Sequence, residues 1–401
     1  MATYVWKGKN RFGDEVSGER TAPNLEAVRA SLQKEQIAVQ KLAKKPTEIS
    51  LSFLERKKVS GKELAIYSRQ LSVLIDAELP LIQGLNILAE QSKNKYFKKV
   101  IIEVREQVEA GSSLNQAKRK FPNVFNDLYC NLIASGEKSG SLDVMLKRLS
   151  EYLENIVKLK SQVKQAMIYP TAILGFSVLV TIFMLWKIVP VFTNIFVEMG
   201  ATLPFLTAAI MALSRFIQGN ILFIFVGAIG LIVGLKYFRK SKTGGPIIDR
   251  ILLKLPLIGN LINKVGLSRL TRTLSTLLGG GVPMLESLKI TSSTSGNSVV
   301  ENKVLKAREL VSQGQSLTDA FKEVKQFPFM LIQMIGVGEA TGTLDAMLGK
   351  LAKFYDDDVE ATVNSLLSIL EPILLFAVGG MVGVIVVSMY LPIFELLNTI
   401  G

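Results

Sequence analysis

The hydrophobic and polar positions of the chain follow patterns that change from one region to the next. Three stretches, residues 165–186, 216–235 and 372–394, contain no charged residue. Each has the roughly 17 to 25 residues that an apolar helix needs to cross about 30 Å of hydrocarbon. We therefore expect three transmembrane helices, the first continuing to residue 190.

Residues 61–164 show a helical pattern, with turn signals between short amphipathic segments. Near the end of this region, apolar residues recur on one helix face: Leu142, Met145, Leu146, Leu149, Leu153 and Ile156. A helix with such a stripe buries it against neighbours, and several such helices joined by short loops form a bundle. The pattern predicts one bundle over residues 61–164 and a second over residues 264–370.

The first 46 residues differ from the rest of the chain. TYVWKGKNRFGDEVSGER alternates apolar and polar positions around a glycine turn, and NLEAVRASLQKEQI then shows helical spacing. Alternation predicts a hairpin and the second pattern a helix. We expect a small N-terminal α/β module, followed by a lysine-rich linker that contains Pro46.

The second bundle repeats the first in sequence. Residues 67–85 align with residues 270–288 at an offset of 203, and six of nineteen positions are identical, including Arg69/Arg272 and Pro80/Pro283. Each repeat is thus a bundle followed by a membrane helix. Two repeats that both run outward need a return span between them, which residues 216–235 supply after a short external loop at 191–215. The predicted fold is mainly α: a polytopic membrane protein with two homologous cytoplasmic bundles.

A glycine-rich turn also occurs twice, as IASGEKSGSLD and as IGVGEATGTLD, at an offset of 202. Its residues are Gly136, Glu137, Gly140 and Asp143 in the first copy and Gly338, Glu339, Gly342 and Asp345 in the second. A single glutamate in a glycine turn is compatible with an active-site loop, but two copies favour a structural joint. We expect the glycines to end one helix, Ser141/Thr343 and the aspartates to start the next, and the glutamates to cap or bridge the joint.

The chain of 401 residues is 49% hydrophobic and carries a net charge of +13. The basic residues flank the spans on one side: Lys158, Lys160 and Lys164 before the first, and Lys236, Arg239, Lys240 and Lys242 after the second. By the positive-inside rule, the N-terminus and the bundles are cytoplasmic and the C-terminus is external. The charge then reflects topology and anionic lipid, and we expect no nucleic-acid partner.

The residue types present exclude much chemistry. There is no histidine and only one cysteine, Cys130. Histidine-based triads, HExxH zinc sites, cysteine-rich metal sites and disulfides within the chain are therefore unavailable. We predict no catalytic, cofactor-binding or metal-binding residue, no cofactor, and a protein that is not an enzyme.

Three other features are compatible with a binding or functional site, but a structural or solvent-exposed role explains each of them better. The run Gly279 to Gly281 lacks the lysine of a phosphate-binding loop, and its counterpart is Asp76-Ala77-Glu78, so we expect a helix-to-helix turn. We expect the acids Asp356 to Asp358, with Glu360, to form a solvated face rather than a cation site. Glu371, next to Pro372, is expected to be an interfacial acid.

These motifs together resemble the GspF/PilC family of inner-membrane platform proteins. The resemblance lies in the N-terminal module, the duplicated bundles with SGEKSGSLD and VGEATGTLD, the proline-bounded spans after each bundle, and MGATLP after the first span. MGATLP and YSRQLSVLIDAELPLIQGL are most similar to the type IV pilus branch. The resemblance implies a homo-oligomer in the bacterial inner membrane that contacts hexameric extension and retraction ATPases, pilins and inner-membrane alignment proteins. It implies a role in coupling the ATPase to pilin insertion and removal.

Two alternatives stay open from the sequence. A type II secretion platform is the alternative within the same family. An oligomeric channel or transporter is the alternative from another class, although the three spans contain no internal charge. Because three glycines replace a polar turn in the second bundle, we do not expect the two bundles to be equivalent as ATPase contacts.

Overall fold

The computed structural model describes residues 2–9, 15–22, 25–35, 37–44, 58–198, 204–241, 243–256, 258–324 and 327–400. These residues belong to two compact units, Met1–Lys57 and Lys58–Gly401. The linker residues 45–57, and MGATLP except for its final Pro204, lie outside the described residues.

The first unit is a three-stranded antiparallel sheet with one helix. Its elements are β1 (Ala2–Lys9), β2 (Glu15–Ala22), α1 (Leu25–Lys34) and β3 (Ala38–Lys44), with strand order β2-β1-β3. Trp6 lies opposite Gly18, which leaves room for the indole ring. The hairpin and helix are as predicted, whereas strand β3 is not evident from the alternation.

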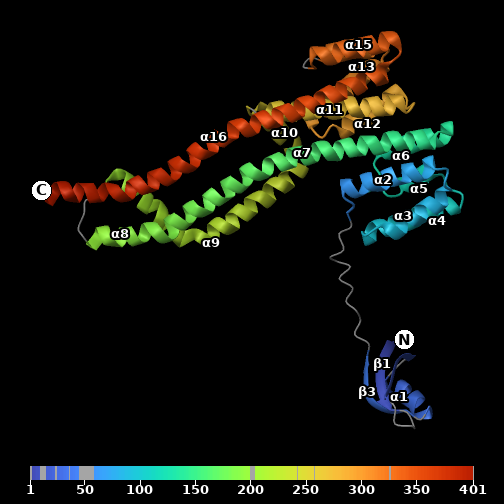
Figure 1. The fold of residues 1–401 in the computed structure, drawn as a ribbon, viewed down its shortest axis with the longest axis horizontal. Coiled ribbons are helices and arrows are strands. Elements are labelled where there is room, and N and C mark those ends of the chain that lie inside the picture. The colour runs from blue at the N-terminus through green and yellow to red at the C-terminus, as the bar shows by residue number, and fades with distance from the viewer. Residues whose placement is uncertain are drawn as a thin grey trace. The chain divides into compact units, whose positions relative to one another are not determined.

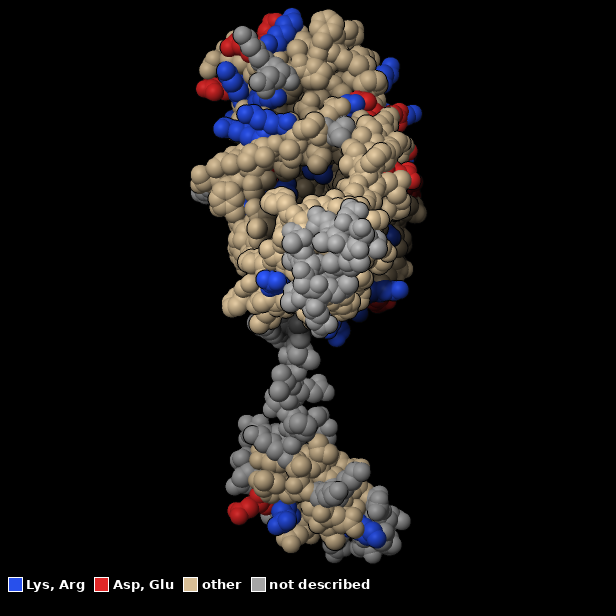
Figure 2. All heavy atoms as spheres, turned by 90° about the vertical axis from the view of Figure 1, so that its left-hand side faces the viewer, with Lys and Arg blue, Asp and Glu red and all other residues tan. Residues whose placement is uncertain are grey.

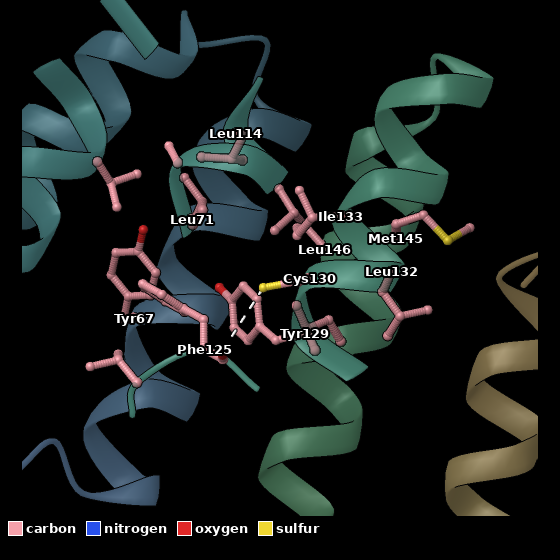
Figure 3. Packing of buried hydrophobic residues seen from close by; sticks show 14 of the residues in the cluster. Tyr67, Leu71, Leu114, Phe125, Tyr129, Cys130, Leu132, Ile133, Met145 and Leu146 are labelled. Carbon is pink, nitrogen blue, oxygen red and sulfur yellow. Dashed lines mark hydrogen bonds between the residues drawn. The ribbon is translucent and has the colours of Figure 1, made fainter. Parts of the chain in front are cut away.

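The first bundle begins the second unit. It contains α2 (Gly61–Asp76), α3 (Leu81–Gln91), α4 (Lys95–Glu109), α5 (Leu114–Arg119), α6 (Asp127–Ser139) and the first part of α7 (Leu142–Phe183). Figure 3 shows the core, where Tyr67, Phe125 and Tyr129 pack with aliphatic side chains from α2, α5, α6 and α7. The apolar stripe of α7 is the face that enters this core, as predicted.

The second bundle repeats this arrangement. It contains α10 (Gly244–Lys254), α11 (Ile258–Gly279), α12 (Met284–Thr294), α13 (Ser298–Ser312), α14 (Leu317–Glu323), α15 (Phe329–Thr341) and the first part of α16 (Leu344–Ile400). Helix starts use the same device in both repeats. Asn94 and Asn297 cap α4 and α13, and Ser113 and Ser316 cap α5 and α14.

Three helical segments are long and apolar enough to cross a membrane: Leu142–Ile195, Phe205–Arg239 and Leu344–Phe394. The first includes a π-helical turn, η2 (Met184–Ile188), and most of α8 (Val189–Glu198). The second lies in α9 (Phe205–Lys240). Helices α10 and α11 would add a fourth span only if counted as one segment across a bend of 114°. We assign α11 to the second bundle because Leu267, Leu270 and Leu274 lie in its core.

The spans are not separate helices that begin at prolines. Pro170 lies inside α7, and Pro372 and Pro392 lie inside α16, so each helix runs without a break from a bundle into the apolar region (Figure 1). Proline removes one backbone hydrogen bond, and packing or local adjustment tolerates this in membrane helices. The predicted loop at 191–215 contains the end of α8 and the start of α9.

The apolar ends of the long helices contact one another through a small cluster. Leu185, Val189, Met211, Ile385 and Met389 are buried there. Thr207 Oγ1 donates a hydrogen bond of 2.6 Å to the carbonyl oxygen of Ser388. Figure 2, which faces the end that carries α8, shows a mostly uncharged surface with lysines, arginines and acids toward its periphery.

The two bundles are in contact with each other. Leu277, Val282 and Ile290 from the second repeat lie in the core cluster of the first bundle. The hydroxyl oxygens of Tyr152 and Thr273 are 3.2 Å apart across this contact. The two repeats therefore form one packed body, which the sequence repeat does not by itself predict.

Candidate functional site

The repeated glycine turn joins the last short helix of each bundle to the long helix that enters the membrane. Gly140 and Gly342 have φ values of 70° and 69°, in the left-handed region. The carbonyl oxygen of Gly136 accepts from the amides of Gly140 and Ser141, and Gly338 does the same at the second joint. This is the usual glycine termination of an α-helix.

Only one glycine of each pair ends a helix. Gly136 and Gly338 lie inside α6 and α15, contrary to the expectation that both glycines break the chain. A Cβ atom on Gly136 would lie 3.0 Å from Cα of Leu142, and one on Gly338 would lie 2.7 Å from Cα of Leu344. These two glycines allow the short helix to approach the long helix closely.

The helix after the turn starts at the expected position, with Ser141 at the N-cap of α7. Ser141 makes no side-chain cap on α7. Instead, its hydroxyl lies 2.6 Å from that of Ser139, and the hydroxyls of Thr341 and Thr343 are 2.7 Å apart. Ser141 thus starts α7 through its backbone position, while its hydroxyl contacts the end of the preceding helix instead of capping. Asp143 and Asp345 lie in the first turn of α7 and α16, where the helix dipole favours an acid.

The two glutamates reach across to a different helix. Glu137 accepts hydrogen bonds from the amides of Leu114 (2.5 Å) and Asn115 (3.2 Å) at the start of α5. Glu339 accepts from the amides of Leu317 (2.9 Å) and Thr318 (3.0 Å) at the start of α14. A carboxylate at a helix N-terminus satisfies free amides and interacts favourably with the helix dipole. Each glutamate thus ties the joint to the preceding short helix.

The environment of Glu339 favours its ionised form. Burial raises the pKa of Glu339, but hydrogen bonds from Thr318 and Leu317 outweigh burial, so the pKa lies below its usual value. The hydroxyl of Thr318 also donates to Glu339 at 2.6 Å. A group with a lowered folded-state pKa contributes stability at neutral pH that is lost as pH falls through that pKa.

The predicted residues Arg69 and Arg272 hold the start of each bundle against its long helix. Arg69 on α2 makes a bidentate ion pair with Glu154 on α7, with distances of 2.7 and 2.6 Å. Hydrogen bonds from Arg69 lower the pKa of Glu154. In the second repeat, Arg272 on α11 pairs with Asp356 on α16, which also accepts from Ser268.

Ion pairs also involve two of the three consecutive acids Asp356 to Asp358, for which the sequence predicts a solvated face. Asp356 and Asp358 are half-buried and paired, the latter with Lys264 at 2.7 Å, whereas Asp357 is exposed. A wholly solvated face is therefore wrong for two of the three acids. Glu371 is exposed on α16. No group of three or more potential metal ligands gathers among the described residues.

The remaining predicted residues lie at the turn between α2 and α3 and at the equivalent turn between α11 and α12. Pro80 precedes α3 and Pro283 precedes α12, in both cases at the N-cap. Gly281 has a φ of 73°, and its counterpart Glu78 adopts a φ of 58°. The glycine run is a helix-to-helix turn, as expected. Glu78 adopts the same conformation despite its side chain, at a cost in strain.

Lys118 is a residue that the sequence patterns do not single out. Its side chain is fully buried in the first bundle, and its ammonium nitrogen lies 4.7 Å from the ring centre of Tyr129, 5.1 Å from Phe125 and 5.2 Å from Tyr67. It donates to the Tyr129 hydroxyl at 3.2 Å. Burial lowers the pKa of Lys118 to about 7, opposed by Cys130 and Glu137.

The repeat alignment contains a signal for Lys118. The offset of 203 that pairs Leu114 with Leu317 also pairs Lys118 with Phe321, which is fully buried and stacks on Phe327 at 4.6 Å. A lysine at the repeat position where the other bundle has a buried phenylalanine is itself expected to be buried. The structure also makes Phe327 the counterpart of Phe125, because each lies two residues before the start of its helix, α15 or α6.

Comparison with known proteins gives the family. The family model for type II secretion system protein F matches residues 67–190 and 270–392, one match for each repeat. The model for the N-terminal domain of that protein matches residues 1–43. The chain belongs to this family. The matches cover the elements that carry both glycine turns and both arginine ion pairs of this GspF/PilC protein.

Relatives along the whole length place the protein with the pilus branch of the GspF/PilC family. It is 38% identical to the type IV pilus assembly protein PilC of Myxococcus xanthus, over the whole chain and 96% of the relative. It is 37% identical to PilC of Pseudomonas aeruginosa, over 93% of the chain and all of the relative. Identity to the type II secretion system protein F of Vibrio cholerae is 33%, over 99% of each chain.

We predict that Glu339→Gln destabilises the second bundle by roughly 0.5 to 1 kcal/mol, because the amide side chain keeps only one acceptor at the start of α14. Thermal unfolding of the purified protein in detergent would measure this. Glu309→Gln, at an exposed position of α13, is the matched control. Equal melting temperatures for the two variants would contradict a capping role.

We also predict that Lys118→Met stabilises the protein by about 1 to 4 kcal/mol at pH 7, because it removes a buried cation. The unfolded chain keeps the lysine proton to about pH 10.4, whereas the folded protein releases it near pH 7. Between these values the unfolded state binds more protons, so this group makes stability rise with pH by up to about 1.4 kcal/mol per unit. Unfolding between pH 6 and 9 should show a shallower rise for Lys118→Met than for the exposed control Lys120→Met, and parallel curves would refute the assignment.

Proposed function

We propose that this protein is the inner-membrane platform of a type IV pilus machine, where it couples cytoplasmic hexameric ATPases to the insertion and removal of pilins. The observation that carries the proposal is full-length similarity to type IV pilus assembly proteins named PilC. Its further partners are the inner-membrane alignment proteins of the machine, the lipid bilayer and other copies of the same chain. No catalytic residue is needed for this role, because the ATPase acts in trans.

The long helices support a mechanical role. Helix α7 has 42 residues and α16 has 57. At 1.5 Å per residue they are roughly 60 and 85 Å long. The same helix that carries Leu146 and Leu149 into the first bundle core continues to Ser177 in the apolar region. A displacement of a bundle by an ATPase would therefore reach the membrane through a continuous backbone.

The proposed topology places both bundles on the cytoplasmic side. Basic residues before the first span and after the second support this orientation, with the N-terminus cytoplasmic and the C-terminus external. Helices α7 and α16 leave their bundles in the same direction (Figure 1), so one membrane face holds both bundles. Helix α9 supplies the return between them.

A type II secretion platform is the second candidate. The family model and the 33% identity to the protein F of Vibrio cholerae favour it. The two candidates share the fold and the coupling mechanism, and they differ in what the machine assembles or exports. A deletion strain separates them.

We predict that deletion of the gene abolishes surface pili and leaves pilin in the membrane. Electron microscopy and fractionation would measure both, with complementation by the intact gene as the control. Normal piliation together with loss of protein secretion would replace the pilus assignment by the secretion assignment. Normal piliation with normal secretion would refute both.

The coupling step has its own prediction. We expect that replacing Lys160, Ser161, Lys164 and Gln165 with glycine weakens α7 by about 3 to 4 kcal/mol of helix propensity relative to the same four positions as alanine, and prevents pilus formation. All four side chains are exposed between the bundle and the span. The matched control replaces the same four residues with alanine, which removes the same charges and keeps the helix. Equal piliation in the two strains, at equal protein levels, would contradict transmission through α7.

A further inference from the structure

The contact between the two bundles uses one face of the first repeat and one turn of the second. The face is formed by Leu132 and Ser135 on α6 and by Arg148 and Tyr152 on α7. The turn is the run of three glycines between α11 and α12. Ser135 donates a hydrogen bond to the carbonyl oxygen of Gly280, and Tyr152 meets Thr273. A Cβ atom on Gly280 would overlap Leu132, and one on Gly279 would overlap Arg148.

The equivalent face of the second repeat is uncovered within the chain. At the offset of 202 the four face residues correspond to Met334, Val337, Lys350 and Phe354. Tyr152 is buried, whereas its counterpart Phe354 is 45% exposed. Ser135 is half-buried, whereas its counterpart Val337 is 50% exposed, and Met334 is half-buried where Leu132 is fully buried. An exposed apolar face of this kind on a folded domain marks an interaction surface.

The equivalent turn of the first repeat is uncovered as well. At the offset of 203 the three glycines correspond to Asp76, Ala77 and Glu78, all exposed, whereas Gly280 is buried. On α2, one helical turn before this turn, Val73 is 57% exposed. The chain thus carries one docked pair of face and turn, and one undocked pair.

The undocked pair is complementary in charge. Lys350 takes the place of Arg148 on the face, and Asp76 and Glu78 take the place of glycines on the turn. No ion pair joins Asp76, Glu78 or Lys350 to another group in the part of the chain that the structure describes. Met334, which is unbranched and adaptable, takes the place of Leu132 where Ala77 adds a methyl group.

We propose that the second bundle of one chain binds the first bundle of another chain, head to tail, in the relation that the two bundles have within one chain. Val337 and Phe354 of one copy pack against the α2–α3 turn and α2 of the next, and Lys350 pairs with Asp76 or Glu78. Helices α7 and α16 lie side by side in the same direction (Figure 1). Repeating the relation therefore keeps the spans of both copies parallel in one membrane.

Disulfide trapping tests this contact in native membranes. The Ser135–Gly280 contact predicts proximity of Val337 and Ala77 from different copies. Two differently tagged chains, one Ala77→Cys and one Val337→Cys, should form a disulfide-linked dimer that carries both tags. Each variant alone should form at least about fivefold less, because a heterologous contact does not bring like positions together. The native Cys130 is buried and remains silent.

A matched pair replaces Val337→Cys with Gln313→Cys, which is exposed at the end of α13. Equal yields for the two pairs, or equal self-linking of the single variants, would overturn the proposal. So would cross-linking of Val337→Cys to a different protein in place of the tagged chain, since that would make the face a docking site for another partner.

The charge pair gives a second arm. Glu78→Lys should lower the yield of the Ala77–Val337 disulfide about two- to fivefold, and Lys350→Glu in the partner copy should restore it. Glu78→Gly should lower the yield while raising the melting temperature, because glycine relieves the positive φ. An unchanged disulfide yield in all three cases would exclude the ion pair between Lys350 and the acidic turn. The inference rests on the proposed topology, but trapping requires no pilus, so its failure is distinct from failure of the proposed function.

Discussion

Helices α7 and α16 each pass from a bundle core into an apolar membrane segment with one unbroken series of backbone hydrogen bonds. At its start, α7 or α16 buries an apolar stripe in a polar-surfaced bundle, and at its end it presents apolar residues on nearly every side. The other helices of each repeat hold the start of that helix in place. Gly136 or Gly338 brings the preceding helix close, a glutamate ties the joint to the short helix before it, and an arginine ion pair holds α2 or α11 against the long helix. A bundle built in this way is joined to its membrane helix by one continuous backbone.

Duplication has preserved the joints and changed the surfaces. Both repeats keep the left-handed glycine, the capping glutamate and the arginine ion pair. In the core, the first repeat has the buried Lys118 where the second has Phe321. On the surface, the second repeat has three glycines where the first has a charged turn. These differences follow a physical logic. Gly279 and Gly280 permit the bundles to meet, because a Cβ atom there would overlap Arg148 or Leu132.

Much of the architecture could be predicted from the sequence, because the signals are local or repeated. The spans follow from length and apolarity, the bundles from helical spacing, and the equivalence of the two joints from the repeat. The sequence could not predict that Glu137 reaches Leu114, because that contact joins residues on different helices. It also could not show that Asp356 is paired, since three adjacent acids have the pattern of a solvated face whether or not a cation lies opposite. The position of Ser141 at the start of α7 could be predicted, but not the partner of its hydroxyl, because Ser139 and the free amides of α7 are both within reach of that side chain.

Helix α9 connects the two repeats covalently, and this gives the two equivalent interfaces different thermodynamic requirements. Within the chain, the bundles meet at the high effective concentration that a tether provides, so a neutral glycine turn that merely fits is sufficient. An interface between separate chains has no tether and must overcome the loss of translational freedom with its own contacts. The acidic turn and Lys350 lie where that additional attraction is required. Expression level would then set the extent of assembly, while the shape of each monomer would stay independent of concentration.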